Sequence, residues 1–85
     1  MDWTVYILEC ADATLYTGIT NDLPRRLQMH ESGTGAKYMR GRGPFTLIHT
    51  ETHPDRSTAS QREATIKSMG RAEKLALSKG KKPGF

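Results

Sequence analysis

Five side chains in this sequence have the chemistry that cutting a phosphodiester bond requires. Tyr6 and Tyr16 lie ten residues apart, Arg26 and His30 follow four residues apart, and Glu63 comes later in the chain. A guanidinium binds phosphate oxygens through paired hydrogen bonds and stays charged at any working pH. An imidazole can donate to phosphate or carry a proton, and a carboxylate can hold Mg²⁺. Together they predict a proton acceptor, a phosphate clamp and a metal ligand.

Each of these residue types also has an ordinary structural role. Arg-x-x-x-His on a helix can be a solvated surface, and a buried tyrosine usually satisfies its hydroxyl at the edge of a core. Glu63 could instead pair with Lys67 four residues later, worth a few tenths of a kcal/mol. A phenol also has a pKa near 10, so it needs a nearby cation to act as a base. Both interpretations stay open at the level of the residues.

A hairpin is expected to carry both tyrosines. Trp3–Glu9 and Thr14–Ile19 are typical of strands, with the turn at residues 10–13. If the loop has an odd number of residues, the tyrosines share the face opposite the odd-numbered apolar residues. Gly18 would leave space beside them. Ala13 stands where a tight turn favours glycine, and a positive φ there would cost about 1 kcal/mol.

The remaining elements are predicted from capping residues and apolar spacing. Asn21 or Asp22 should begin the helix that holds Arg26 and His30, with Leu23 and Leu27 as its apolar stripe and Gly33 at its end. Arg26 and His30 are expected in a parallel row at the border between this stripe and solvent. A third strand is expected over Phe45–Thr50, followed by a turn at 51–55. The next helix should be capped by Ser57 or Thr58, with Gln61 in a capping box, and should end near Met69. A last helix is expected over Arg71–Lys79. The order β-β-α-β-α-α predicts an α+β fold, a three-stranded sheet flanked by helices.

Charge and loop composition favour a nucleic-acid partner. Residues 1–24 carry −4, whereas residues 25–85 hold all 13 Lys and Arg against five acids, or +8. Such segregation suits a polyanion, although many small proteins are mildly basic without binding one. The glycine-rich stretch 31–44 interleaves cations with an aromatic ring, as backbone-tracking loops do. The candidate nucleic-acid contacts are Arg25, Lys37, Tyr38, Arg40, Arg42 and Lys67.

Size and composition exclude other classes of protein. We expect a single domain over residues 1–80 and a disordered basic tail over 81–85. The one cysteine, Cys10, rules out an internal disulfide and is interpreted as a small buried hydrophobe. His49 and His53 are interpreted as structural or surface residues and not as a zinc pair, because Pro54 denies them a shared helix. No signal peptide is visible and no stretch approaches the roughly 20 apolar residues of a membrane span, so a soluble, cytoplasmic protein is expected.

In combination, five short stretches resemble the GIY-YIG endonuclease superfamily. More narrowly, they are similar to its small, single-domain bacterial branch, related to the Slx-type nuclease domain. The resemblance covers roughly residues 3–79, and the stretches are Val5–Leu8, Leu15–Thr20, Arg25–His30, Lys37–Tyr38 and Arg62–Lys67. It implies a three-stranded antiparallel sheet flanked by helices.

The resemblance also implies roles for individual residues. Tyr6 matches the tyrosine proposed to activate the attacking water, and Tyr16 matches the one that helps to place the water or the metal shell. Arg26 matches the arginine that binds the scissile phosphate, and His30 the His or Tyr one turn later. Glu63 matches the single glutamate that holds Mg²⁺ or Mn²⁺, which would stabilise the leaving 3′-oxygen.

The chain departs from the family pattern at backbone and packing positions. Thr4 and Val5 replace the glycine and isoleucine of the first motif, and Thr17 replaces the middle residue of the second. The leading hypothesis is a metal-dependent DNA endonuclease, weakly sequence-selective, with branched or damaged DNA as candidate substrates. The alternative is a nucleic-acid-binding module that retains the nuclease fold without turnover.

Overall fold

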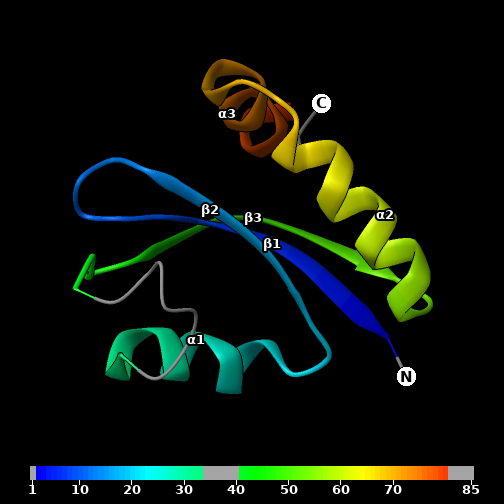
Figure 1. Cartoon of the computed structure of the whole chain (residues 1–85), viewed down its shortest axis with the longest axis horizontal. Coiled ribbons are helices and arrows are strands. Elements are labelled where there is room, and N and C mark those ends of the chain that lie inside the picture. The colour runs from blue at the N-terminus through cyan, green and yellow to red at the C-terminus, as the bar shows by residue number, and fades with distance from the viewer. Residues whose placement is uncertain (1, 34–40, 81–85) are drawn as a thin grey trace.

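A three-stranded antiparallel sheet lies between helices on both of its faces (Figure 1). The computed structural model describes residues 2–33 and 41–80. The elements are β1 (Trp3–Glu9), β2 (Leu15–Thr20), α1 (Leu23–Ser32), β3 (Thr46–His53), α2 (Arg56–Lys67) and α3 (Arg71–Gly80). The strand order is β2-β1-β3, so β1 is central. The predicted α+β class and order of elements are confirmed. Within those two ranges, no helix is long and apolar enough to cross a membrane.

The hairpin register puts both tyrosines on one face. Tyr6 lies opposite Gly18 and Glu9 lies opposite Leu15. The loop between the strands, residues 10–14, therefore has an odd number of residues. The predicted parity is therefore confirmed. Ala13 has a φ of 70°, and its N–H donates to the Cys10 carbonyl at 2.9 Å. This turn needs a left-handed residue and uses alanine for it.

Both faces of the sheet are buried, each under a different helical layer. Val5 and Ile7 pack against Ala59 and Ile66 of α2, with Trp3, Leu15, Ile19, Ile48, Met69 and Leu77 around them. On the other face, Tyr6, Leu8 and Cys10 pack with Tyr16, Leu23, Leu27 and Phe45. Figure 1 shows α1 on one side of the sheet and α2 with α3 on the other. The apolar stripe of α1 and the burial of Cys10 are as predicted.

Local signals set both ends of α1. The Asp22 carboxylate accepts a hydrogen bond from the Arg25 N–H, as an N-cap does. Gly33 ends the helix with a φ of 83°. Both residues were candidates for these positions on sequence alone.

The predicted bounds of β3 and α2 are wrong. β3 continues to His53, because Val5 and Trp3 of β1 pair with Glu51 and His53, where a turn was expected. Asp55 caps α2 by accepting from the Thr58 N–H at 2.8 Å, so neither Ser57 nor Thr58 is the cap. α2 ends at Lys67 with Ser68 as its C-cap, before Met69.

Replacing Ala13 with glycine is expected to stabilise the protein. Glycine adopts a φ of 70° without the Cβ clash, so Ala13→Gly should raise the free energy of unfolding by about 1 kcal/mol. Urea unfolding followed by circular dichroism would measure it. Ala11→Gly is the control, since Ala11 lies in the same turn at negative φ and its replacement should be neutral or destabilising. Equal effects of the two substitutions would contradict this account.

Candidate active site

A buried cluster of aromatic rings forms where α1 crosses the tyrosine face of the sheet. The Tyr6 hydroxyl lies 2.9 Å from Nε2 of His30, and both side chains are almost fully buried. The Tyr16 ring meets the His30 ring edge-on at 5.2 Å between centroids and lies 6.2 Å from the Tyr6 ring. The sheet and α1 thus bring two phenols and an imidazole into one site.

His30 is more deeply buried than the sequence predicted. The spacing suggested that Arg26 and His30 form a row at the border between the apolar stripe and solvent. In the structure His30 is 2% exposed, whereas Arg26 is only partly buried. His30 follows Leu23 by seven positions and Leu27 by three, so it belongs to the inward stripe itself.

Burial sets the protonation states of the two hydrogen-bonded groups. Burial raises the pKa of Tyr6 to about 12; Arg26 opposes this shift, while the charges of Tyr16 and Glu63 add to it. Burial, and then the positive charge of Arg26, lower the pKa of His30 below 6.5. At neutral pH the phenol is therefore protonated and the imidazole neutral. Which group donates in the bond between the Tyr6 hydroxyl and Nε2 of His30 depends on the imidazole tautomer. Nδ1 of His30 is buried without a hydrogen-bond partner in the part of the chain described.

Arg26 approaches both phenols from α1. A hydrogen bond with Tyr6 raises the pKa of the guanidinium, burial opposes the rise, and Tyr16 adds to it. Nε of Arg26 is buried and makes no hydrogen bond among the described residues. A guanidinium has five N–H donors, so Arg26 keeps donors for an anion at this site.

Gly18 makes the packing of the tyrosines possible. A Cβ at this position would lie 2.7 Å from the Tyr6 hydroxyl and 3.0 Å from the Tyr16 ring. Carbon atoms do not approach an oxygen so closely without displacing it. The space that Gly18 was expected to leave is therefore occupied by the two rings.

Glu63 comes from α2, on the opposite side of the sheet from α1. Its charge still contributes to the raised pKa of Tyr6. Its carboxylate lies 3.3 Å from Nζ of Lys67, so the predicted i,i+4 pair is present, and the Lys67 side chain is 55% exposed. No described contact joins Glu63 to Arg26.

The donor set fits a hydrated cation and not an all-protein cage. Across residues 2–33 and 41–80, no group of three His, Cys, Asp or Glu side chains is arranged to hold a metal ion. Mg²⁺ keeps most of its water and often takes a single carboxylate together with phosphate oxygens. Glu63 fits that requirement, because its carboxylate is partly exposed and its ion pair is with an exposed lysine.

The structure describes only some of the residues that were predicted to contact nucleic acid. Arg25 is exposed on α1, beside Arg26. Arg42 forms an ion pair with Asp12 at 2.5 Å, which ties the segment after residue 40 to the hairpin turn. Lys37, Tyr38 and Arg40 lie outside the described residues, as does the tail 81–85.

Sequence reasoning missed one residue of the cluster, Phe45. Its ring meets the His30 ring edge-on at 6.1 Å. A bulge makes this possible: Ile7 pairs with His49 and Leu8 with Leu47, so Ile48 has no partner and the alternation of side chains shifts. No local signal marks that bulge in the sequence. His49 and His53 lie on the other face and contact Glu51, consistent with the structural role expected of them.

Comparison with known proteins identifies the family. A model of the GIY-YIG catalytic domain matches residues 2–76, so the chain belongs to the GIY-YIG family of nuclease domains. It is 56% identical over 73 residues to a UPF0213 protein of Oceanobacillus iheyensis, covering 86% of this chain and 85% of that protein. It is 55% identical over 76 residues to a UPF0213 protein of Natronomonas pharaonis, covering 89% of each.

Solved structures agree with the fold. The solution NMR structure of a UPF0213 protein from Bacillus halodurans shares 45% identity with a TM-score of 0.63, covering 99% of this chain and 89% of that one. A protein from E. faecalis shares 40% identity with a TM-score of 0.67, covering 94% and 85%. The resemblance to the GIY-YIG superfamily seen in the sequence is confirmed.

Adding one methyl group at Gly18 should disrupt the site. Gly18→Ala must displace the Tyr6 ring, so we expect the free energy of unfolding to fall by about 1–3 kcal/mol. The Tyr6 and His30 NMR resonances should shift more than those of residues on the α2 face. Gly70→Ala is the control, because its Cβ would meet only Glu73 Oε1 at 3.7 Å. Ring resonances unchanged in Gly18→Ala would show that the rings do not need this space.

Proposed function

We propose that this protein is a metal-dependent DNA endonuclease that hydrolyses phosphodiester bonds with weak sequence selectivity. The observation that carries the proposal is the Tyr6–His30 hydrogen bond beside Arg26. A proton acceptor, a phenol and a phosphate-binding cation lie together on a domain whose family cleaves nucleic acid. Branched or damaged DNA remains the candidate substrate class.

The hydrogen bond supplies a route for the proton of the attacking water. A pKa of about 12 leaves almost no phenolate at neutral pH, so Tyr6 cannot accept a proton unless it releases its own. Neutral His30, in the tautomer that carries its own proton on Nδ1, would accept that proton at Nε2 while the phenol oxygen takes one from water. The water oxygen then bonds to phosphorus, the bond to the 3′-oxygen breaks, and His30 is left as imidazolium.

Arg26 and Tyr16 would position the substrate. Arg26 would bind a non-bridging oxygen of the scissile phosphate and stabilise the charge that grows there. Tyr16 is partly exposed, whereas Tyr6 has no exposed surface, so Tyr16 is the phenol that DNA reaches first. We propose that Tyr16 holds the water against Tyr6 once DNA covers the site.

Glu63 would hold the divalent cation, Mg²⁺ or Mn²⁺. When bound, that ion would neutralise charge on the leaving 3′-oxygen. Around it the protein would contribute a single carboxylate, with Lys67 close enough to bind a neighbouring phosphate. Arg25 and Lys67, with the basic residues of the 31–44 stretch, would hold the DNA backbone without reading its sequence.

The second candidate function is a DNA-binding module without turnover. It is favoured by the complete burial of Tyr6 and by its high pKa, both of which are typical of a structural tyrosine. Such a module would bind DNA in a salt-dependent manner without any metal and cleave no form of it.

Cleavage of plasmid and branched DNA with Mg²⁺ separates the two functions. We expect Arg26→Ala and Glu63→Gln each to lower the rate about 10²–10³-fold, because each removes charge stabilisation of the transition state. Gln28→Ala is the matched control, since Gln28 is exposed on the same helix as Arg26. Equal cleavage by all four proteins would indicate a contaminating nuclease, and no cleavage by any, with DNA still bound, would indicate the binding module.

The rate should depend on the protonation of His30. The neutral imidazole is the acceptor, and burial beside Arg26 lowers its pKa, with Tyr6, Tyr16 and Phe45 as its other neighbours. The cleavage rate should therefore stay level down to about pH 6.5 and fall only at lower pH. His30→Gln should remove this acid limb and lower the rate about 10²–10⁴-fold.

One further measurement completes the pH experiment. DNA binding followed by fluorescence anisotropy over the same pH range shows whether the fall in rate reflects lost binding. A midpoint above pH 6.5, or an acid limb that persists in His30→Gln, would exclude His30 as the proton acceptor.

A further inference from the structure

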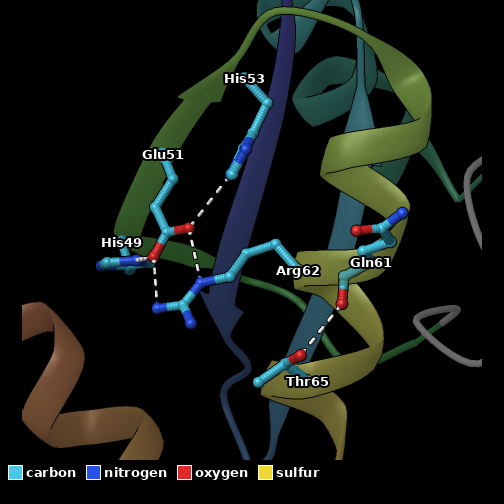
Figure 2. Close-up of polar contacts among 6 residues, drawn as sticks. All are labelled: His49, Glu51, His53, Gln61, Arg62 and Thr65. Carbon is cyan, nitrogen blue, oxygen red and sulfur yellow. Dashed lines mark hydrogen bonds and ion pairs between the residues drawn. The ribbon is translucent and has the colours of Figure 1, made fainter.

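A second polar cluster joins α2 to β3 on the face away from the tyrosines. Figure 2 shows Arg62 reaching from α2 to Glu51, which also meets His49 and His53 of its own strand. Nε and a terminal nitrogen of Arg62 lie 2.9 and 3.0 Å from the two oxygens of Glu51. Nε2 of His49 lies 2.8 Å from one oxygen and Nε2 of His53 lies 3.3 Å from the other. Both carboxylate oxygens of Glu51 are therefore held by hydrogen bonds.

Arg62 and Glu63 flank the buried stripe of α2 on opposite sides. Ala59 and Ile66, seven residues apart, are the buried residues of this helix. At about 100° per residue, Arg62 and Glu63 lie about 50° to either side of the line between them. Arg62 turns toward β3, while the charge of Glu63 acts on Tyr6. A rotation of α2 about its axis would therefore move Glu63 relative to the tyrosines.

Apolar packing alone gives α2 little resistance to such a rotation. Ala59 presents only a methyl group, so Ile66 is the one large buried side chain on the helix. At the N-terminal end, Arg56 lies over the Trp3 ring at 5.5 Å. Arg62 is more than a turn further along, where its two-pronged contact with Glu51 fixes both distance and direction.

The contact persists across the working pH range. Burial would raise the pKa of Glu51, but hydrogen bonds from Arg62, His49 and His53 outweigh it and lower that pKa to about 2. The carboxylate is thus charged whenever the protein is folded near neutrality. The Glu51 side chain is 18% exposed and that of Arg62 is 32% exposed, so solvent screens the pair only in part.

We propose that the Glu51–Arg62 ion pair sets the rotation of α2 and thereby positions the carboxylate of Glu63 at the active site. Glu51 and Arg62 are then positioning residues that touch neither DNA nor the reacting atoms. The inference rests on the proposed function, because it gives a role to the metal-binding carboxylate.

The first test measures the Mg²⁺ dependence of DNA cleavage in Arg62→Met and, as a second variant, Glu51→Gln. We expect the half-saturating Mg²⁺ concentration to rise at least fivefold in Arg62→Met, while metal-free DNA binding changes less than twofold. Ile66→Val is the control, because it lowers stability by trimming the core of the same helix and leaves the ion pair intact. Thr65→Ala is a second control that removes only a bond within α2.

The second test needs neither metal nor activity. A nitroxide is attached to the cysteine of Lys67→Cys in a Cys10→Ala background. It broadens the NMR signal of each backbone amide of the sheet more strongly the closer that amide lies to position 67 of α2. Arg62→Met should change the order of broadening among the β2 and β3 amides, and Ile66→Val should not.

The two tests separate failure of the inference from failure of the proposed function. If the wild type cleaves DNA and Arg62→Met has normal Mg²⁺ dependence, the positioning role is overturned while the nuclease stands. If the wild type cleaves nothing, the proposed function fails. The nitroxide measurement alone then shows whether the ion pair sets the orientation of α2. An unchanged broadening order in Arg62→Met and Glu51→Gln overturns the positioning role in either case.

Discussion

The hydrogen bond between Tyr6 and His30 is the constraint on which the tyrosine face of the protein depends. A phenol buried on the central strand must find a polar partner, because an unsatisfied hydroxyl in the interior costs about 1–3 kcal/mol. His30 can supply that partner only if α1 lies close to the sheet, and Gly18 supplies the room. The closeness that satisfies the phenol also buries both groups, and this burial shifts both pKa values toward the neutral forms.

The sheet separates two tasks that a hydrolytic site must combine. The α1 layer carries the phenols' partners, Arg26 and His30, whereas the α2 layer carries the carboxylate, Glu63. Residues on opposite layers can act on one phosphate only if the orientation of each helix is fixed. α1 is fixed by its caps and by the buried ring cluster, whereas α2 has a narrow apolar stripe and depends on polar contacts to β3.

The features that sequence reasoning predicted correctly are those with local causes. The parity of the hairpin loop determines which face Tyr6 and Tyr16 share, and Asp22 caps the helix that follows it by accepting from the Arg25 N–H only three residues away. The Asp55 cap of α2 and the inward position of His30 had local signals that were misinterpreted, whereas the other missed features come from partners distant in the sequence. Pairing with β1 extends β3 past Thr50, and the bulge that brings Phe45 to His30 forms between strands about forty residues apart. The resemblance to the family identified Glu63, but the residues beside it in the sequence did not show on which side of the sheet it lies.

The raised pKa of Tyr6 limits how this site can work. A base with a pKa of about 12 is strong when deprotonated but is almost never deprotonated at neutral pH. A neighbour that removes the phenol proton at the moment of attack resolves this conflict without a standing phenolate. In the proposed mechanism His30 meets that need only while it is neutral; burial keeps it neutral in the first place, and the positive charge of Arg26 adds to the effect. The same guanidinium that would bind the phosphate would thus also help to maintain the proton acceptor, so one residue would contribute to both binding and proton transfer.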